Sequence, residues 1–291
     1  MPQDIDASLV DPYLKARPRL FAVAYRMVGS ASDAEDILQD CFLRWQQVQR
    51  RDVRDAAAFL QRVVVRLCLD FQKSARVQRE TYPGEWLPEP IVLDTPPLAQ
   101  DVSYAMLRML ERLTPPERAA YLLHDIFENG YGELAETLER SEASCRQLVA
   151  RARQHVQHDR TRTASNSAAE EAITLAFFKA AKTGDTKTLS ELLTREARLY
   201  SDGGGKAAAA INPISGAERI CRLFEGLARK SNHTLPDRWK LCRLNGLPAV
   251  LSQEPDGILQ ATLLVFQDGV VHRLYVVRNP DKTAHLSDLM Q

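Results

Sequence analysis

Apolar residues recur at helical spacing through about residues 10–80. The stretch 37–48 shows this period clearly, and Ser32 followed by Glu35 predicts a capping box at the start of its helix. A second amphipathic helix is predicted over residues 56–75. Its apolar face would carry Phe59, Val63, Leu67 and Phe71. We therefore expect this first part of the chain to be all α-helical.

Five prolines between residues 81 and 102 interrupt the helical pattern. Proline removes a backbone donor and its ring clashes with the preceding helical turn, so an extended linker is predicted here. Trp86 and Leu87 are unusual residues for a solvated tether. Because an exposed tryptophan has no use in such a tether, the linker is expected to dock on another part of the protein.

Helical periodicity returns between residues 103 and 162. The stretch 114–117, reading Thr-Pro-Pro-Glu, predicts a helix cap with proline at the first helical position. A short helix over 131–138, a tight turn and a helix over 142–155 follow. The inward face of the last helix would carry Cys145, Val149, Ala152 and Val156. A short helix, a turn and a helix with outward arginine and glutamine are typical of a helix-turn-helix.

From about residue 168 the pattern changes to helices followed by alternating strands. Helices are expected over 169–181, 186–193 and 217–229, and strands over 197–200, 239–244, 249–253, 259–266 and 270–277. Gln267-Asp268-Gly269 between the last two strands predicts a hairpin turn. The expected fold class is therefore multidomain, with two all-α helical domains followed by an α+β cone.

The net charge of the chain is zero, with 26% charged residues, but the basic residues are clustered. They concentrate between residues 44 and 79 and again between 140 and 162. Basic patches on a neutral chain fit nucleic-acid binding that depends on a partner better than autonomous binding. No apolar run approaches the roughly 18 residues of a membrane span, and no signal peptide is visible at the N-terminus. We therefore expect a cytoplasmic protein that does not bind a membrane.

The five cysteines are scattered and odd in number, and none forms a C-x-x-C pair. Three of them fall on expected apolar helix faces. They are interpreted as reduced core residues, so neither a disulfide framework nor a metal site is predicted. No cofactor is expected.

Two segments of the chain carry a family resemblance. Residues 21–45, reading FAVAYRMVGSASDAEDILQDCFLRW, strongly resemble region 2 of sigma-70-family transcription initiation factors. Residues 113–156 resemble region 4, the helix-turn-helix that reads the −35 promoter element in that family. Nothing between them resembles region 3, which points to the extracytoplasmic-function (ECF) group. The resemblance implies a sigma factor, a non-enzymatic protein that directs RNA polymerase core to promoter DNA and initiates transcription.

The final third of the chain is similar to SnoaL-like domains of the NTF2-like fold. Three signatures match an ECF subgroup in which such a domain is fused to the sigma factor. They are Trp86-Leu87-Pro88-Glu89-Pro90, Asp202-Gly203-Gly204-Gly205-Lys206 and Asn279-Pro280-Asp281-Lys282. The resemblance implies regulation in cis by the extension, so no separate anti-sigma factor is expected. The implied domains are region 2 over 1–80, a linker over 81–102, region 4 over 103–162 and a regulatory domain over 168–291.

Carried onto this sequence, the resemblance assigns polymerase core binding to Asp36, Gln39 and Asp40. An acidic face near a helix N-terminus is also favoured by the helix dipole alone. Binding of the single-stranded −10 element needs cations along the DNA backbone and a base pocket. The candidates are Arg51, Arg54, Arg62, Arg66 and Lys73.

Recognition of the −35 element is assigned to the predicted helix over 142–155. Arginine can contact guanine and glutamine can contact adenine through two hydrogen bonds, so Arg146 and Gln147 are the candidate base readers. Ser144, Arg151 and Arg153 are better placed for phosphates. Two positions depart from the family pattern. Arg140 stands in the turn where glycine is common, and Leu148 replaces a usual basic residue.

The candidate regulatory and interdomain residues come from the three signatures. They are Trp86, Pro88, Asp202, Gly203, Gly204, Gly205, Lys206, Asn279, Pro280, Asp281 and Lys282. The triple glycine lacks the frame of a phosphate-binding loop, so it is expected to allow close backbone approach, docking on the Trp86 linker or on region 2. An NTF2-like cone commonly has an open mouth, which leaves room for a small-molecule ligand. His233, Asp237 and His272 are the candidates for acid–base chemistry there.

Two other functions stay open at this point. One is a ligand-sensing regulator that binds DNA without polymerase. The other is a SnoaL-type cyclase or isomerase with a vestigial DNA-binding front. A basic recognition helix argues against the enzyme, and the neutral net charge argues against polymerase-independent DNA binding because few phosphate contacts are available.

Overall fold

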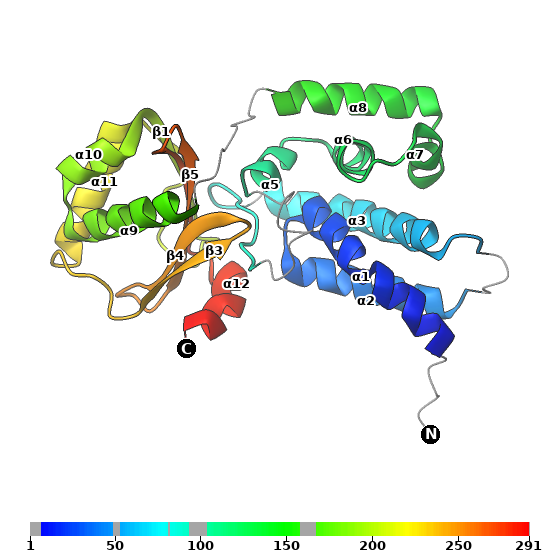
Figure 1. Cartoon of the computed structure of the whole chain (residues 1–291), viewed down its shortest axis with the longest axis horizontal. Helices are drawn as coiled ribbons and strands as arrows, with labels where there is room; N and C mark the ends of the chain where they lie inside the picture. Colours follow the sequence, from blue (N-terminus) through cyan, green and yellow to red (C-terminus); the bar gives the residue numbers. More distant parts are fainter. Residues whose placement is uncertain (1–6, 49–52, 81, 93–103, 158–166, 291) are drawn as a thin grey trace. The chain divides into compact units, whose positions relative to one another are not determined.

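The computed structural model describes residues 7–48, 53–80, 82–92, 104–157 and 167–290, and it divides into two compact units (Figure 1). The first unit comprises residues 1–80, 95–102 and 106–160. The second comprises residues 81–94, 103–105 and 161–291, so the docked part of the linker belongs to the C-terminal unit. Outside the described residues lie Arg51, the Pro96-Pro97 pair, residue 103 and the boundary over 158–166.

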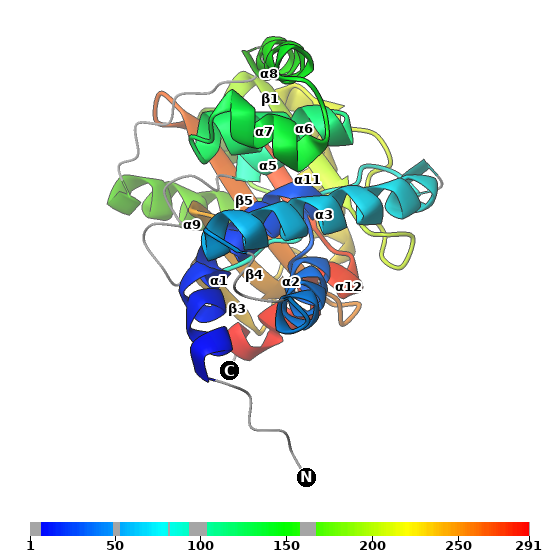
Figure 2. The same cartoon turned by 90° about the vertical axis from the view of Figure 1, so that its right-hand side faces the viewer.

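The first unit begins with three helices, α1 (Ala7–Val28), α2 (Ala31–Gln46) and α3 (Ala56–Glu80), which pack against one another (Figure 2). Burial of apolar side chains between them removes hydrocarbon from water, which is the main favourable term in folding. The core of this bundle is built from Leu20, Val23, Met27, Leu38, Cys41, Leu60, Val64 and Cys68, all less than 2% exposed.

Two local predictions for this bundle are wrong. The N-cap of α2 is Ser30, whose side chain accepts a hydrogen bond from the Asp33 amide, and not Ser32. Of the four residues predicted for the apolar face of α3, Leu67 is buried, but Phe59, Val63 and Phe71 are only half-buried. The rest of the buried face carries Leu60, Val64 and Cys68. The buried face also includes two glutamines, and one of them, Gln72, donates a hydrogen bond to the Met27 carbonyl. Because the prediction used apolar residues alone, it placed most of the buried face of α3 one residue before its actual position.

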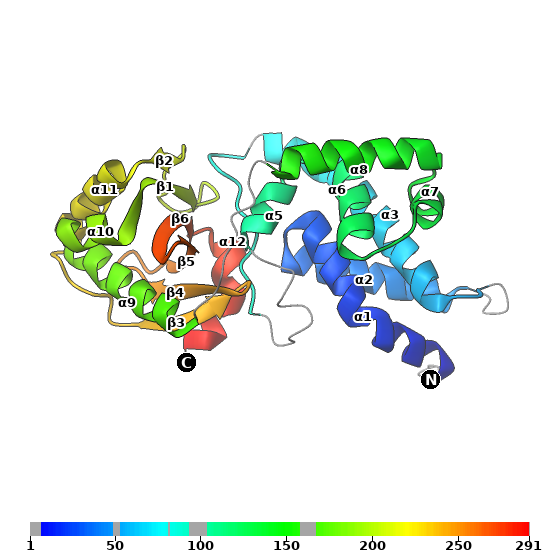
Figure 3. The same cartoon turned by 45° about the horizontal axis from the view of Figure 1, so that its top comes forward.

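The second helical part contains α5 (Tyr104–Leu110), α6 (Pro115–Tyr121), a π-helical turn η2 (Leu122–Ile126), α7 (Tyr131–Leu138) and α8 (Glu142–Gln157). The predicted cap before α6 is confirmed, because the Thr114 amide donates to the Glu117 carboxylate at 3.1 Å. The predicted α7–turn–α8 motif is also confirmed, and α8 packs along α6 and α7 (Figure 3). In the turn it is Glu139, and not Arg140, that has the left-handed backbone, with φ 53°.

A buried arginine joins the two helical parts of the first unit. Arg118 of α6 is only 2% exposed, and its guanidinium donates to the Met27 carbonyl at 2.6 Å and to Glu111 at 2.8 Å. Gln61 of α3 donates to the Asn129 side chain at 2.8 Å. A buried cation is tolerated only when paired and hydrogen-bonded, so these contacts fix α6 on α1.

The second unit is an α+β cone. Three helices, α9 (Ser167–Thr183), α10 (Thr186–Leu192) and α11 (Ala217–Lys230), pack on a curved six-stranded sheet of order β2-β1-β6-β5-β4-β3. The strands are β1 (Leu193–Asp202), β2 (Ile214–Ser215), β3 (Trp239–Leu244), β4 (Leu247–Gln253), β5 (Leu259–Gln267) and β6 (Val270–Val277). Only the β1–β6 pair is parallel among the described strands. Register shifts interrupt the β1–β6 and β5–β6 pairs, and such bulges bend a sheet.

The predicted strands β3 and β6 have the bounds expected from the sequence, and the others are extended by a few residues. The two-residue β2, the short helix α12 (Pro280–Thr283) and the 3-10 helix η3 (Ala284–Met290) were not predicted. The core between helices and sheet includes Phe177, Leu189, Leu199, Ile220, Leu264 and Leu274.

A pair of identical substitutions tests where this core lies. Leu264→Ala should lower the free energy of unfolding by about 2–5 kcal/mol, because Leu264 is 1% exposed and its removal leaves a cavity. Leu235→Ala, at a position 37% exposed, should change it by less than about 0.5 kcal/mol. Urea unfolding followed by tryptophan fluorescence measures both. Equal losses would contradict the placement of the core.

Candidate functional site

The candidate polymerase-binding residues share one exposed face of α2. Asp36, Gln39 and Asp40 are all exposed, opposite the buried Leu38 and Cys41. Asp36 and Gln39 also line a groove of about 340 Å³ between α1 and α2. The groove continues onto Leu14, which is 55% exposed. The face thus combines an acidic row with exposed apolar surface, which is a composition suited to binding another protein.

The candidate −10 residues are not all open to solvent. Arg62 of α3 donates to the Glu136 carboxylate of α7 at 2.5 Å. Arg66 donates to the carbonyl of Glu136 at 3.1 Å and lies 3.0 Å from the Glu139 carboxylate. Both arginines therefore hold α3 against the helix-turn-helix in this structure. Arg54 is exposed, and Lys73 is exposed and pairs with Asp70 on its own helix.

On the recognition helix α8, the predicted apolar stripe is confirmed. Cys145, Val149, Ala152 and Val156 are each at most 2% exposed. Since each helical residue turns about 100°, Gln147 and Arg151 lie on the side opposite this stripe, whereas Arg146 and Arg153 lie on its flank. Gln147 and Arg151 are exposed, and Ser144 is half-buried.

The two flanking arginines of α8 have partners inside the helix-turn-helix. Arg146 donates to Glu142 at 2.8 Å, and its guanidinium lies 5.0 Å from the centre of the Tyr131 ring. Arg153 makes a two-pronged contact with the Asp125 carboxylate of η2, and this hydrogen bonding raises the pKa of Arg153. Arg153 therefore positions α8 on η2.

The three signatures of the second unit meet at one buried carboxylate. Asp202, at the end of β1, has a side chain that is 0% exposed. It accepts four hydrogen bonds, from the Tyr82 hydroxyl at 2.6 Å, the Leu87 amide at 2.9 Å, the Gly204 amide at 3.0 Å and the Lys282 ammonium at 2.7 Å. Two of these donors belong to the linker. We call Tyr82, Trp86, Leu87, Asp202, Asn279 and Lys282 the linker cluster.

Lys282 of α12 is the cation of the linker cluster. Its side chain is 9% exposed, and it also donates to the Leu87 carbonyl at 2.6 Å. Its ammonium lies 3.8 Å from the Trp86 ring centre and 5.0 Å from that of Tyr82. Two aromatic faces, a carboxylate and a carbonyl therefore replace water around one buried ammonium. This explains why the linker carries a tryptophan.

Asn279 links the cluster to its surroundings. Its side chain caps α12 by accepting from the Asp281 amide at 3.1 Å, and it donates to the Tyr82 hydroxyl at 2.9 Å. Pro280 follows at the first position of α12, where no amide donor is needed. Burial, together with the hydrogen bond to Asp202, raises the pKa of Tyr82. The hydroxyl therefore stays protonated and available as a donor.

The triple glycine provides close approach, as the sequence suggested. Gly204 and Gly205 have positive φ angles of 60° and 72°. A side chain at Gly204 would collide with Asn279, and one at Gly205 would meet the Pro83 ring at 2.9 Å. The next residue, Lys206, forms an exposed ion pair with Asp281 at 2.6 Å. The loop thus docks against the linker, one of the two surfaces considered from sequence.

The second half of the docked linker is held through its backbone groups, which bond mostly to side chains. The Ile91 amide donates to the Asn245 side chain at 3.0 Å, and the Asn245 amide donates to the Ile91 carbonyl at 2.9 Å. The Pro88 carbonyl accepts from the Tyr104 hydroxyl at 2.6 Å. His285 contacts the Pro90 carbonyl at 2.9 Å. Residues 87–91 are consequently buried, although the stretch contains no helix or strand.

Sequence reasoning missed Tyr82, Asn245, Tyr104 and His285 as functional residues. For Tyr82, the available signal was that it is a second aromatic residue, with Trp86, in a segment predicted to be an extended linker. Asn245 has a left-handed backbone, with φ 49°, in the β3–β4 turn. Such a turn is predictable from Asn-Gly, but its use as a docking point for the linker is not.

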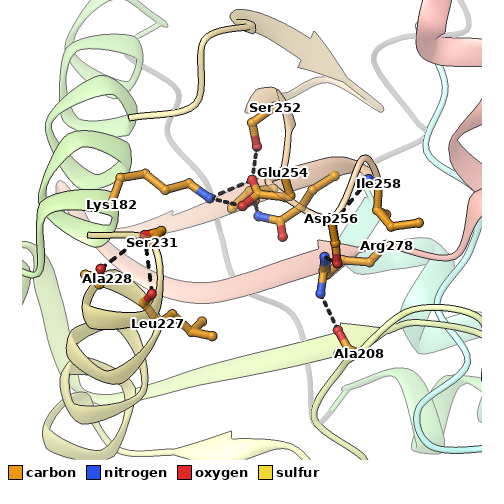
Figure 4. Close-up of polar contacts among 12 residues, drawn as sticks. Lys182, Ala208, Leu227, Ala228, Ser231, Ser252, Glu254, Asp256, Ile258 and Arg278 are labelled. Atoms are coloured by element: carbon orange, nitrogen blue, oxygen red, sulfur yellow. Dashed lines mark hydrogen bonds and ion pairs between the residues drawn. The ribbon is translucent and has the colours of Figure 1, made fainter. Parts of the chain in front are cut away.

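The α+β cone has a small cavity between its helices and its sheet. A cavity of about 20 Å³ lies among Phe177, Phe178 and Phe224, with Thr174, Gln260 and Thr262 as its polar lining. At its rim, Lys182 donates to both oxygens of Glu254 at 2.6 Å, and Ser252 donates to the same carboxylate (Figure 4). None of His233, Asp237 and His272 lines this cavity. His233 instead contacts the Thr183 carbonyl at 2.7 Å, and His272 lies 3.3 Å from Thr194.

The cysteines are free thiols, and burial raises the pKa of Cys242 to about 11 and that of Cys41 to about 12. Within the described residues, no group of three or more histidine, cysteine or acidic side chains is placed to bind a metal ion.

In the part of the chain that the structure describes, no helix combines the length and apolarity needed to cross a membrane.

Comparison with known proteins defines the class. Models of sigma-70 region 2 and of sigma-70 region 4 match residues 13–77 and 103–156. ECF RNA polymerase sigma factor SigJ of Mycobacterium tuberculosis (strain ATCC 25618 / H37Rv) is 37% identical over 289 residues, covering 94% of this chain and 92% of that protein. ECF RNA polymerase sigma factor SigG of M. tuberculosis (strain CDC 1551 / Oshkosh) is 28% identical, covering 64% of this chain and 58% of that protein.

Among solved structures, the crystal structure of the M. tuberculosis extracytoplasmic function sigma factor SigJ superposes with a TM-score of 0.76 and 32% identity. The match covers 94% of this chain and 98% of that one, so it includes the α+β cone. The chain belongs to the ECF RNA polymerase sigma factors. Its fold is that of two helical sigma domains followed by an α+β cone with a six-stranded sheet.

Two lysine–aspartate pairs of the same signatures test the linker cluster. Lys282→Met removes the partner of a fully buried carboxylate, so it should lower the free energy of unfolding of the second unit by about 3–5 kcal/mol. Lys206→Met breaks a pair whose side chains are 57% and 62% exposed, and should cost at most about 1 kcal/mol. Urea unfolding, followed by the fluorescence of Trp86 and Trp239, compares them. A similar loss for both variants would argue against a buried charge pair.

Proposed function

We propose that this sigma factor binds polymerase core through the acidic face of α2 and promoter DNA through α3 and α8, and that its C-terminal domain controls it through the linker. In this proposal residues 1–80 act as region 2, 81–102 as the linker, 103–162 as region 4 and 168–291 as the regulatory domain. The observation that carries the DNA-binding role is α8, whose apolar stripe is buried while Gln147 and Arg151 point away from it.

The proposed core-binding face is the row of Asp36, Gln39 and Asp40. The row borders the groove between α1 and α2, where Leu14 is exposed. A partner helix with basic and apolar side chains would match both features, since complementary charge sets orientation and apolar area supplies affinity. The chain would meet the polymerase in the cytoplasm.

For the −35 element, we assign base contacts to Arg146 and Gln147 and phosphate contacts to Ser144, Arg151 and Arg153. A two-bond contact to a base discriminates by about 1–3 kcal/mol. Arg153 would contribute less than a free arginine, because it is already bound to Asp125. Leu148, the residue that replaces a usual basic residue of the family, is half-buried beside the stripe and brings no charge to this surface.

For the −10 element, Arg54, Arg62, Arg66 and Lys73 would follow the single-stranded backbone, together with Arg51 in the undescribed loop. Arg62 and Arg66 contact α7 in the structure, and these contacts must break before the arginines can bind DNA. The structure is therefore best interpreted as a closed form of region 2 and region 4.

The linker cluster would regulate this closed form. The linker joins α3 to α5, and residues 82–91 are anchored on the C-terminal domain. Anchoring shortens the free tether between region 2 and region 4. A shorter tether favours contact between the two regions, because closing a shorter loop costs less conformational entropy than closing a longer one. Release of the linker would favour the open form, and no separate anti-sigma protein is needed. The cavity of about 20 Å³ accommodates only about one water molecule, so a larger ligand could bind at that place only if the cone opened.

Run-off transcription with purified polymerase core tests the sigma activity. The full chain should direct a discrete transcript from a promoter selected by the wild-type protein. The double variant Asp36→Lys/Asp40→Lys should need at least about tenfold more sigma factor for half-maximal yield, because like charges across an interface are repulsive. Asp11→Lys, an exposed acidic residue on α1, is the control and should stay within about twofold.

Absence of any specific transcript with the wild-type protein would contradict the proposal. A mobility shift of the same promoter without core would then identify a polymerase-independent DNA-binding regulator instead.

The same assay tests regulation through the linker. Lys282→Met should raise the transcript yield about threefold or more. The variant releases the linker and so lengthens the free tether between region 2 and region 4. A doubling of tether length disfavours the closed form by about 0.6 kcal/mol, which is about a threefold change in the equilibrium. Lys206→Met should leave the yield unchanged, because its pair is exposed and contributes little. Truncation after residue 205 removes Lys282 and should act in the same direction. Equal yields from all four proteins would show that the C-terminal domain does not act through the linker.

A further inference from the structure

Arg146 is an exposed arginine that is nevertheless held on two sides. Its side chain is 55% exposed, yet one terminal nitrogen donates to Glu142 at 2.8 Å. The guanidinium carbon lies 5.0 Å from the ring centre of Tyr131. Within this distance an arginine is attracted to the negative face of the ring. Both contacts lie inside the helix-turn-helix and need no other part of the protein.

Tyr131 is itself fixed in place. It is the first residue of α7 and is half-buried. Its ring centre lies 4.3 Å from that of His124, with 32° between the planes. A nitrogen of His124 lies 2.9 Å from the Asn129 carbonyl oxygen. A continuous chain of contacts therefore runs from η2 through Tyr131 to Arg146.

The acidic partner of Arg146 is placed by the same helix. A side chain added at Gly132 would lie 3.7 Å from the Glu142 carboxylate, so this carboxylate lies beside the first turn of α7. Glu142 is four residues before Arg146 on α8, where two helical side chains face each other. The arginine thus has one defined direction, set by the start of α7.

A long side chain loses rotamer freedom when it binds, and a side chain already held in its bound direction loses less. Such preorganisation matters most for a planar guanidinium that must meet two acceptors of one guanine. A tyrosine face supplies attraction without competing for the guanidinium donors. Glu142 occupies only one of these donors in the free protein.

We propose that Tyr131 is a positioning residue for promoter recognition, and that its ring holds Arg146 in the direction from which it contacts a guanine of the −35 element. The inference rests on the proposed base contact of Arg146. It predicts that Tyr131 influences which base pair is preferred, although it does not itself contact the DNA.

The test compares Tyr131→Phe and Tyr131→Leu in the full-length chain bound to polymerase core. Affinity is measured by fluorescence anisotropy for a selected promoter duplex and for duplexes that each carry one substituted −35 base pair. Arg146→Ala identifies the base pair at which discrimination is lost. Tyr131→Leu should reduce discrimination about fivefold at that base pair and leave the other positions within about twofold. Tyr131→Phe keeps an aromatic face and should retain the wild-type preference.

Thermal unfolding of each variant accompanies the binding measurements, and Tyr131→Met provides a second flexible apolar replacement should the leucine variant fail to fold. Loss of discrimination in Arg146→Ala with none in Tyr131→Leu would overturn the inference and leave the proposed function intact. Equal weakening of every duplex by Tyr131→Leu would show a packing role and would also overturn it. If Arg146→Ala kept full discrimination at every base pair, Arg146 would make no base contact. The proposed role of Arg146 and the inference about Tyr131 would then both be wrong.

Discussion

The structure of the C-terminal unit depends on the burial of one carboxylate. Asp202 is removed from water at the end of β1, and an ionised carboxylate in that position must be compensated by hydrogen bonds and a cation. The Gly204 amide is a local donor, but the other donors come from two places far from Asp202 in sequence, the linker through Tyr82 and Leu87, and α12 through Lys282. Because neither donor set is local, the linker has to dock for this charge to be satisfied.

This constraint links the α+β cone to the two DNA-binding modules through covalent connectivity. The anchored residues follow α3 and precede α5, so their position limits how far region 2 and region 4 can separate. Within the first unit, Arg62 and Arg66, which we propose as DNA-binding residues, are hydrogen-bonded to Glu136 of α7. Under the proposed function, both observations belong to one mechanism, in which these arginines stay paired with α7 while the linker is anchored and become available to DNA when it is released.

Local periodicity predicted much of this molecule. The buried stripe of α8, the Thr114 cap and the bounds of β3 and β6 follow from patterns that neighbouring residues set among themselves. The prediction failed where polar residues join a core, as Gln72 does on α3, because burial of a hydrogen-bonded glutamine leaves no apolar signal.

For the candidate site, the signatures identified Asp202, Lys282 and Trp86 as important, and the linker was one of two surfaces expected to receive the glycine loop. They gave no sign that Lys282 joins Asp202 and Trp86. The hydrogen bond between Tyr82 and Asp202 spans 120 positions, and that between Leu87 and Lys282 spans 195. Periodicity carries no information at such separations, so the geometry had to come from the structure. The same holds for Arg62 and Arg66, whose partners lie about 70 residues away on α7.

Hydrogen exchange of the linker amides in the full-length protein tests the central claim most directly. The Leu87 and Ile91 amides donate to Asp202 and Asn245, so they should exchange as slowly as sheet amides of the second unit. Asp202→Ala should make the Leu87 amide exchange rapidly. Exchange of both amides in the wild-type protein at the rate of an unstructured chain would contradict the account, because the linker would then be a free tether.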